Sequence, residues 1–220
     1  MEKIIARLER IQTKNITDWE KGFMESLLGQ VNKGHKLSQK QLEILSKTEN
    51  KHSDEAVAKR NAWQAQWDDK KQEIAVICAH YYLGAGYFSD LARNLISNEK
   101  FIPTEKQFNA MCKNKYAQKV IDATFAEPKY EVGSMVSIRK TCGADAYLGR
   151  YPLRQMVEAP VIIVGVGNKP VLSASKGAKV YQILPIGSAE AYYIEERHLK
   201  RFKKPKKRSD QIGSQDEILF

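Results

Sequence analysis

The 220-residue chain contains only three cysteines, Cys78, Cys112 and Cys142, which are widely separated. Three scattered thiols are too few for a disulfide framework and lack the spacing of a zinc site. Reduced thiols of this kind are typical of cytosolic proteins. We therefore expect neither a disulfide-stabilised fold nor a metal held by cysteine.

Long apolar runs are also lacking. The longest, IAVICAHYYLGAG, has about a dozen residues and contains His80. It is too short to span a bilayer and is typical of a buried core helix. The first residues, MEKIIARLERIQ, form a charged amphipathic helix pattern without the apolar block of a signal peptide. These features predict no membrane partner and a cytoplasmic location, which would be the host cytoplasm for a phage-encoded chain.

The motifs of common active sites are missing as well. GVGN, at residues 165–168, lacks the third glycine of a dinucleotide loop, and Pro170 stands where a helix would begin. There is no phosphate-binding GxxxxGK[ST] loop and no GxSxG elbow, and the four histidines show no paired-ligand spacing. We expect no enzyme, no catalytic residue, no cofactor and no metal. An active site assembled from distant residues leaves little trace in one sequence, so an enzyme stays as an alternative.

Positive charge is what the chain has in excess, with 36 Lys and Arg against 26 Asp and Glu and a net charge of +10. The excess is uneven. Residues 1–127 hold 20 basic and 17 acidic side chains, a net of +3, whereas residues 128–220 hold 16 and 9, a net of +7. Polyanions, nucleic acids above all, are the expected partners of such a local excess.

Residues 1–125 follow helical periodicity with a single proline, Pro103, and we expect a helical domain. Ile4, Leu8 and Ile11 belong to one apolar stripe. Trp63 and Trp67 lie four residues apart, which places them on one helix face, and we expect them to pack in the core. A role in stacking on bases would require them to be exposed.

An internal repeat runs through this helical part. LSQKQLEILSK at residues 37–47 matches PTEKQFNAMCK at residues 103–113, and each follows an apolar helix and a polar link. The repeat predicts a duplicated helix-turn-helix hairpin, at about residues 19–52 and 87–121.

The spacing that the two copies share is that of a capping box. Ser38 and Thr104 are the predicted N-caps, and Gln41 and Gln107 reach back to them. The alternative role is functional: Lys40 and Lys106, beside the helix N-termini, would hold a backbone phosphate.

From residue 126 to 202 short alternating segments separated by glycine and proline turns replace the helical pattern. Tyr130–Ile138, APVIIVGVG, KVYQILP and AYYIEE are the expected strands, and they predict a small antiparallel β-barrel. Over residues 128–202, with VGSMV as the sharpest part, the pattern resembles the KOW and Src-homology-3-like barrels of transcription, translation and DNA-processing proteins. Barrels of this type serve many unrelated functions.

Two basic segments of this second part predict nucleic-acid contacts. The loop RKTCGADAYLGRYPLRQ interleaves basic residues with Tyr147 and Tyr151, as a phosphate-tracking and base-stacking surface does. The segment at residues 197–208 contains eight basic residues and no acid. The predicted contacts are Arg139, Lys140, Arg150, Arg154, Arg197, Lys200, Arg201, Lys203, Lys204, Lys206, Lys207 and Arg208. The alternatives are a solvated loop for the first segment, and a solubility tail or targeting signal for the second.

Residues 203–220 read as a disordered basic tail that ends in QDEILF. This ending resembles the sliding-clamp-binding peptides of bacterial and phage replication proteins, and also the acidic tip of bacterial single-stranded DNA-binding proteins. The clamp is the favoured partner, because no clear OB barrel precedes the tail. The resemblance implies partner contacts by Gln215, Ile218, Leu219 and Phe220, inserted into a preformed pocket. An idle or self-docking terminus is the alternative.

Together these features predict an α+β protein with a helical N-terminal domain, a small antiparallel barrel and a flexible tail. The box FxxSLL…LSxKQ also resembles one in DNA-metabolism proteins of tailed phages. We expect a non-enzymatic accessory factor in DNA replication, repair or clamp-linked transcription, which binds DNA in preference to RNA. The alternatives are an RNA- or ribosome-associated protein, and a protein-interaction adaptor or host-takeover factor.

Overall fold

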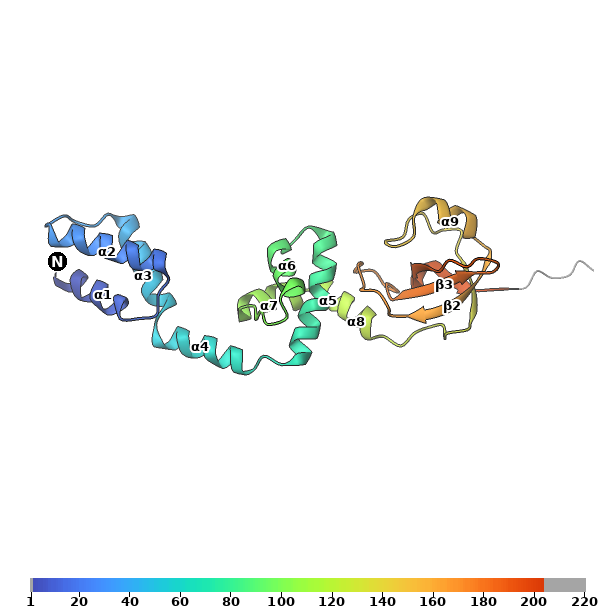
Figure 1. Cartoon of the computed structure of the whole chain (residues 1–220), viewed down its shortest axis with the longest axis horizontal. Coiled ribbons are helices and arrows are strands. Elements are labelled where there is room, and N and C mark those ends of the chain that lie inside the picture. Colours follow the sequence, from blue (N-terminus) through green and yellow to red (C-terminus); the bar gives the residue numbers. More distant parts are fainter. Residues whose placement is uncertain (1, 204–220) are drawn as a thin grey trace, which may run out of the picture. The chain divides into compact units, whose positions relative to one another are not determined.

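The structure, a computed structural model, describes residues 2–203 and is an α+β fold (Figure 1). Helices come first and a five-stranded antiparallel sheet follows, as the sequence predicts. None of the described helices is long and apolar enough to cross a membrane. Contacts divide the chain into two compact units: residues up to Glu73 with Asn98–Ala110, and Ile74–Ser97 with the residues from Met111 onward. The predicted boundary near residue 125 lies inside the second unit.

The first unit is built on three helices, α1 (Glu2–Gln12), α2 (Asp18–Asn32) and α3 (Gln39–Lys51). Their apolar stripes meet in a core that contains Leu8, Met24, Leu27 and Leu45, all with no exposed surface. Helix α4 (Asp54–Ala65) follows and buries none of its residues fully. The first unit therefore obtains its core from the amphipathic patterns that the sequence displays.

Both predicted capping boxes are present, and they begin α3 and α7 (Glu105–Cys112). In the first, the Ser38 N–H donates to Gln41 Oε1 at 2.8 Å and the Gln41 N–H donates to Ser38 Oγ at 3.3 Å. In the second, the Thr104 N–H donates to Gln107 Oε1 at 2.9 Å and the Gln107 N–H donates to Thr104 Oγ1 at 3.3 Å. The repeated sequence thus satisfies the same backbone groups at two helix starts.

Trp63 and Trp67 pack against each other and against Phe108, but they are not fully buried as the predicted core position requires. Both are half-buried, and their rings lie 5.6 and 5.5 Å from the ring of Phe108. The Trp63 indole N–H donates to the carbonyl of Pro103 at 2.8 Å, and that of Trp67 donates to Gln72 Oε1 at 3.2 Å. Both indole N–H groups therefore have partners inside the first unit, and both rings pack against Phe108 although neither is fully buried.

Helices α5 (Asp69–Ala85), α6 (Ser89–Ser97) and α8 (Lys115–Phe125) complete the helical part. The apolar run of α5 is buried through Ala75, Cys78, Ala79 and Tyr82, as expected of a core helix. Asn114 caps α8 by accepting from the backbone N–H of Tyr116 and of Ala117. All three cysteines are buried and free.

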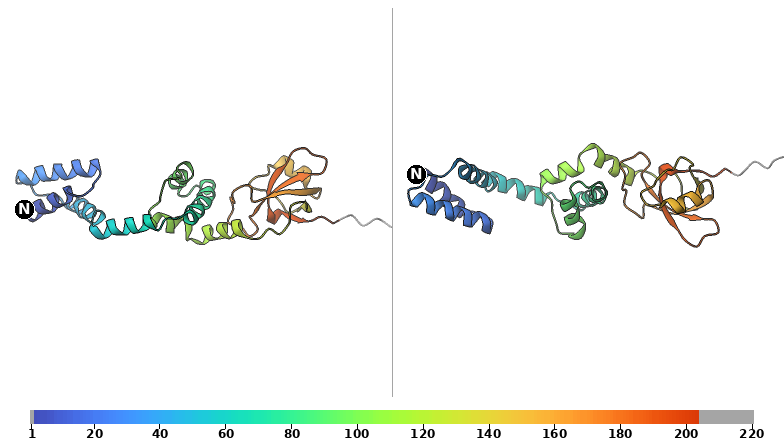
Figure 2. Two further views of the ribbon diagram at one scale, coloured as in Figure 1. Left: turned by 60° about the horizontal axis from the view of Figure 1, so that its bottom comes forward. Right: turned by 90° about the horizontal axis from the view of Figure 1, so that it is seen from above.

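The sheet has the strand order β4-β3-β2-β1-β5, with every neighbouring pair antiparallel. Its strands are β1 (Met135–Ile138), β2 (Pro160–Val166), β3 (Val180–Pro185), β4 (Tyr192–Glu195) and β5 (Leu199–Arg201). The two edge strands, β4 and β5, are consecutive in the chain and are joined only by the 3-10 turn η1 (Glu196–His198). The sheet must therefore curl strongly, which Figure 2 shows from two sides.

The first strand is shorter than the sequence predicts. The strand pattern begins at Tyr130, but β1 begins at Met135, and Val132 is 63% exposed. Gly133 has φ +88°, a conformation that side chains disfavour, and its N–H donates to the carbonyl of Ile163 at 2.8 Å. The glycine in VGSMV therefore makes a turn into the strand rather than continuing it.

One helix, α9 (Arg150–Met156), is inserted between β1 and β2 and lies against the sheet (Figure 1). It contributes Leu153 and Met156 to the sheet core, alongside Val136, Ile138 and Ile163. The predicted long loop thus contains a helix at its end. Because α9 is anchored by two apolar side chains, its remaining side chains have defined directions.

Candidate nucleic-acid interface

Eight of the twelve predicted nucleic-acid contacts lie in the described part of the chain. Lys204, Lys206, Lys207 and Arg208 lie outside the described residues, as do the predicted partner contacts Gln215, Ile218, Leu219 and Phe220.

Three of the eight converge on one cavity of about 400 Å³, here called the basic cavity. Lys140 approaches from the loop that follows β1, and Arg150 and Arg154 approach from α9. The other lining residues are Cys142, Gly143, Leu153 and Val157. Residues that are separate in the sequence thus surround a single concave surface.

The spacing along α9 explains why the two arginines meet. Arg150 and Arg154 are four residues apart and therefore lie on the same helix face. Both are exposed, and within residues 2–203 neither forms an ion pair. Unpaired guanidinium groups beside a cavity are available for a bound anion, and their planar donors match the geometry of a phosphate.

An acid borders the basic cavity. The Glu158 carboxylate forms ion pairs with Lys200 of β5 and, at 3.9 Å, with Lys140. The hydrogen bond from Lys200 holds the pKa of Glu158 below its usual range. Glu158 has φ +67°, and its N–H donates to the carbonyl of Ile138 at 3.1 Å. No sequence motif marks this residue, which is ion-paired with two of the predicted lysines.

The other predicted contacts are arranged differently. The Arg139 Nε–H donates to the carbonyl of Leu199 at 3.0 Å, which ties the loop to β5. The Arg197 Nε–H donates to the carboxylate of the buried Glu195. Arg201 and Lys203 are exposed at the end of the described chain. Arg139 and Arg197 therefore have structural partners, whereas Arg201 and Lys203 are open to solvent.

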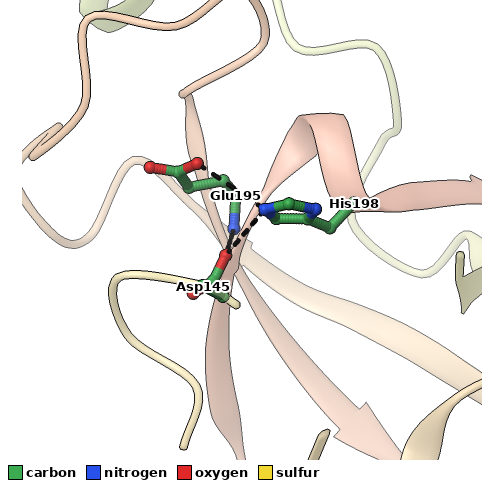
Figure 3. A group of neighbouring side chains, drawn as sticks. All are labelled: Asp145, Glu195 and His198. Atoms are coloured by element: carbon green, nitrogen blue, oxygen red, sulfur yellow. Dashed lines mark hydrogen bonds and ion pairs between the residues drawn. The ribbon is translucent and has the colours of Figure 1, made fainter. Parts of the chain in front are cut away.

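A buried polar cluster, Asp145, Glu195 and His198, lies where this loop meets β4 and η1 (Figure 3). Asp145 Oδ1 accepts from the N–H of Tyr147 at 2.8 Å and of Leu148 at 3.1 Å, and its Oδ2 accepts from the N–H of Glu195 at 3.0 Å. His198 Nε2 lies 3.7 Å from Asp145 Oδ2 and 3.9 Å from Glu195 Oε2. Asp145 therefore fastens the loop of the basic cavity to the edge of the sheet.

Burial controls the charges of this cluster. It raises the pKa of Glu195 and lowers the pKa of His198, so both side chains are shifted toward their neutral forms. The three residues offer ligand atoms within 4.8 Å of one another, as a metal site would. However, Asp145 Oδ2 already accepts a backbone N–H, and Glu195 Oε2 accepts from the Arg197 guanidinium. The cluster thus fastens the loop to β4 through Asp145, while Glu195 Oε1 and His198 Nε2 have no hydrogen-bond partner within residues 2–203.

The two tyrosines of the predicted loop have different environments. The Tyr147 hydroxyl donates to the carbonyl of Pro170, and burial raises the pKa of Tyr147 to about 12. Tyr151, on α9, is 74% exposed. Only Tyr151 is therefore placed to contact a ligand through its ring.

Lys40 and Lys106, the alternative phosphate contacts of the repeat, are both exposed in the first unit. Lys106 lines a cavity of about 220 Å³ together with Lys59 and Arg60. Their role stays a prediction.

Comparisons of the chain with protein-family models, with curated proteins and with solved structures found no match.

Proposed function

We propose that the chain is a nucleic-acid-binding accessory protein whose β part holds the phosphate backbone in the basic cavity. The observation that carries this proposal is the convergence of Lys140, Arg150 and Arg154 on one cavity, with both arginines free of ion pairs in the described part. Neutralising phosphates with such side chains releases counterions and gives affinity that depends on salt rather than on sequence.

The arrangement supports binding rather than chemistry. The basic cavity is lined by cations, a buried thiol and apolar side chains, and burial raises the pKa of the Cys142 thiol, which weakens it as a nucleophile. We accordingly propose a non-enzymatic role in DNA replication, repair or clamp-linked transcription.

A salt titration of two double variants tests the proposal. Arg150→Gln with Arg154→Gln removes two cavity charges, and Lys21→Gln with Lys70→Gln removes two exposed helix charges as a matched control. Binding to single-stranded DNA, duplex DNA and RNA is followed by fluorescence anisotropy over rising salt. For the first pair we expect weaker binding, and a plot of log affinity against log salt whose slope is less negative by about 1.4 to 1.8. The control pair should change the slope little.

Equal losses in the two double variants would show that net charge, not the basic cavity, drives binding, and would overturn the proposal. Absence of binding to any nucleic acid at low salt would favour a protein-interaction adaptor. A clear preference for RNA would instead favour an RNA- or ribosome-associated protein over a DNA accessory factor.

A further inference from the structure

Helix α9 lines two cavities with two different faces. Arg150, Leu153 and Arg154, at spacings of three and four, line the basic cavity. Tyr151, Pro152, Gln155 and Met156 line a second one. One short helix therefore has a cationic face and a second, uncharged face that carries Tyr151, because residues three or four apart share a side of a helix.

The second cavity, here called the aromatic cavity, has a volume of about 460 Å³, within the range of small-molecule sites. Its other wall is one end of the sheet, where Pro160 begins β2, Pro185 ends β3 and Tyr192 begins β4. The strand register places these three at the same end, since Val161 pairs with Pro185, and Ile183 with Tyr192. The remaining lining residues are Ala159, Ile186 and Ser188.

The lining of the aromatic cavity contains no charged side chain. Tyr151 is 74% exposed and Ile186 is 56% exposed, so large apolar surfaces face solvent there. The Tyr192 hydroxyl donates to Glu190 at 2.6 Å, which restricts the orientation of its ring. Gln155 and Ser188 add a few hydrogen-bonding groups. Flat aromatic surfaces with few polar groups suit a planar ring with hydrogen-bonding edges, such as a nucleobase.

The two cavities adjoin through neighbouring residues of α9. Tyr151 and Arg154 are three residues apart and are therefore neighbours on the surface of α9, which places one cation of the basic cavity beside the ring that lines the aromatic cavity. A nucleotide likewise carries a charged phosphate beside an uncharged planar base. In a duplex the base is paired and stacked inside, whereas in a single strand it can turn outward onto an aromatic side chain.

We propose that the aromatic cavity receives an unpaired base of a single-stranded nucleic acid whose phosphates bind in the basic cavity. The inference rests on the proposed nucleic-acid function and adds the class of ligand. Tyr151 is the stacking residue, and Tyr192 forms the opposite wall. Charge complementarity selects this occupant, because Arg154, the surface neighbour of Tyr151 on α9, attracts a polyanion rather than a neutral peptide.

Removal of the Tyr151 ring tests the inference. Tyr151→Ala, Tyr151→Phe and the control Tyr87→Ala, which removes another tyrosine that is 70% exposed, are compared by anisotropy on a single-stranded oligonucleotide and on a blunt-ended duplex. We expect Tyr151→Ala to lose about 5- to 100-fold in single-strand affinity and to leave duplex affinity within about twofold. Tyr151→Phe, which keeps the ring, and Tyr87→Ala should bind like the parent chain.

Photocrosslinking of the full chain to an oligonucleotide that contains 5-iodouracil gives a second readout. We expect crosslinked peptides that contain Tyr151 or Tyr192. Equal affinity of the parent chain for single strand and duplex, or an unchanged single-strand affinity of Tyr151→Ala, would overturn the inference. In that case the loss of binding by the Arg150 and Arg154 double variant would still support the proposed function, so the two failures are distinguishable.

Discussion

At the scale of single residues, Glu20 is a carboxylate of the first unit whose ionised form is strongly stabilised by its hydrogen bonds. Its side chain is 7% exposed, and it accepts from Lys51 Nζ at 2.7 Å and from the Thr17 N–H at 2.9 Å. His52 Nε2 lies 3.1 Å from Glu20 Oε2, the same carboxylate oxygen that accepts from the Thr17 N–H. The hydrogen bond from Lys51 is the largest cause that lowers the pKa of Glu20 to about 2. Its ionised form therefore helps to hold α2 against α3.

Glu20→Gln should lower the free energy of unfolding at pH 7 by about 2 kcal/mol, because hydrogen bonds to a charged group are lost. The folded pKa of about 2 lies below the ordinary value of 4.5, so the contribution is present above pH 4.5 and is lost as the pH falls toward 2. The difference between parent and variant should therefore shrink over this window. Urea unfolding at pH 7, 4 and 3 measures it, with the exposed Glu25→Gln in the same helix as the control. A difference that stays constant with pH would contradict the assignment.

At the scale of elements, the sequence predicts the two capping boxes but does not predict the aromatic cavity that α9 lines. The capping boxes at Ser38 and Thr104 are local, because cap and partner are three residues apart, and both are confirmed. The aromatic cavity has walls about 40 residues apart, from Tyr151 to Tyr192, so its formation depends on strand register. Periodicity within a segment carries no information about such a distant partner.

Glu158, which follows α9, is expected to weaken nucleic-acid binding in the parent chain. Glu158→Gln frees Lys140 and Lys200 from their ion pairs and removes a charge that repels phosphate. We expect a rise in affinity of about two- to fivefold at low salt, the range that a partly exposed ion pair allows. Anisotropy at two salt concentrations measures the change. Glu131→Gln, an exposed acid elsewhere in the second unit, is the control, and an equal rise in both variants would assign the effect to net charge.

At the scale of the whole molecule, the tail prediction is separable from the nucleic-acid prediction. QDEILF, with Gln215, Ile218, Leu219 and Phe220 as the predicted contacts, lies beyond the described residues, whereas the two cavities of α9 lie within them. A tethered peptide and a folded binding surface can act independently, and the tether raises the effective concentration of each partner for the other.

If the tail binds a sliding clamp, deletion of residues 215–220 should abolish retention on that clamp and leave nucleic-acid affinity unchanged. A pull-down with immobilised clamp and an anisotropy titration of the same preparation measure the two properties. A chain with Ile218, Leu219 and Phe220 changed to alanine keeps the length and serves as the matched comparison. Unchanged clamp retention in both variants would exclude the clamp as the partner of the tail.

The sequence by itself determined the α+β order of elements, the capped helix starts, the packed tryptophans and the segregation of basic charge into the second part. These features follow from the periodicity and composition of short segments, which depend on residues close together in the sequence. Only the tertiary structure decided that Lys140, Arg150 and Arg154 share a cavity, that the Tyr147 hydroxyl is hydrogen-bonded while Tyr151 is exposed, and that Glu158 is ion-paired with Lys140 and Lys200. The physical reason is that the curl of the sheet and the anchoring of α9 by Leu153 and Met156 set the directions of these side chains.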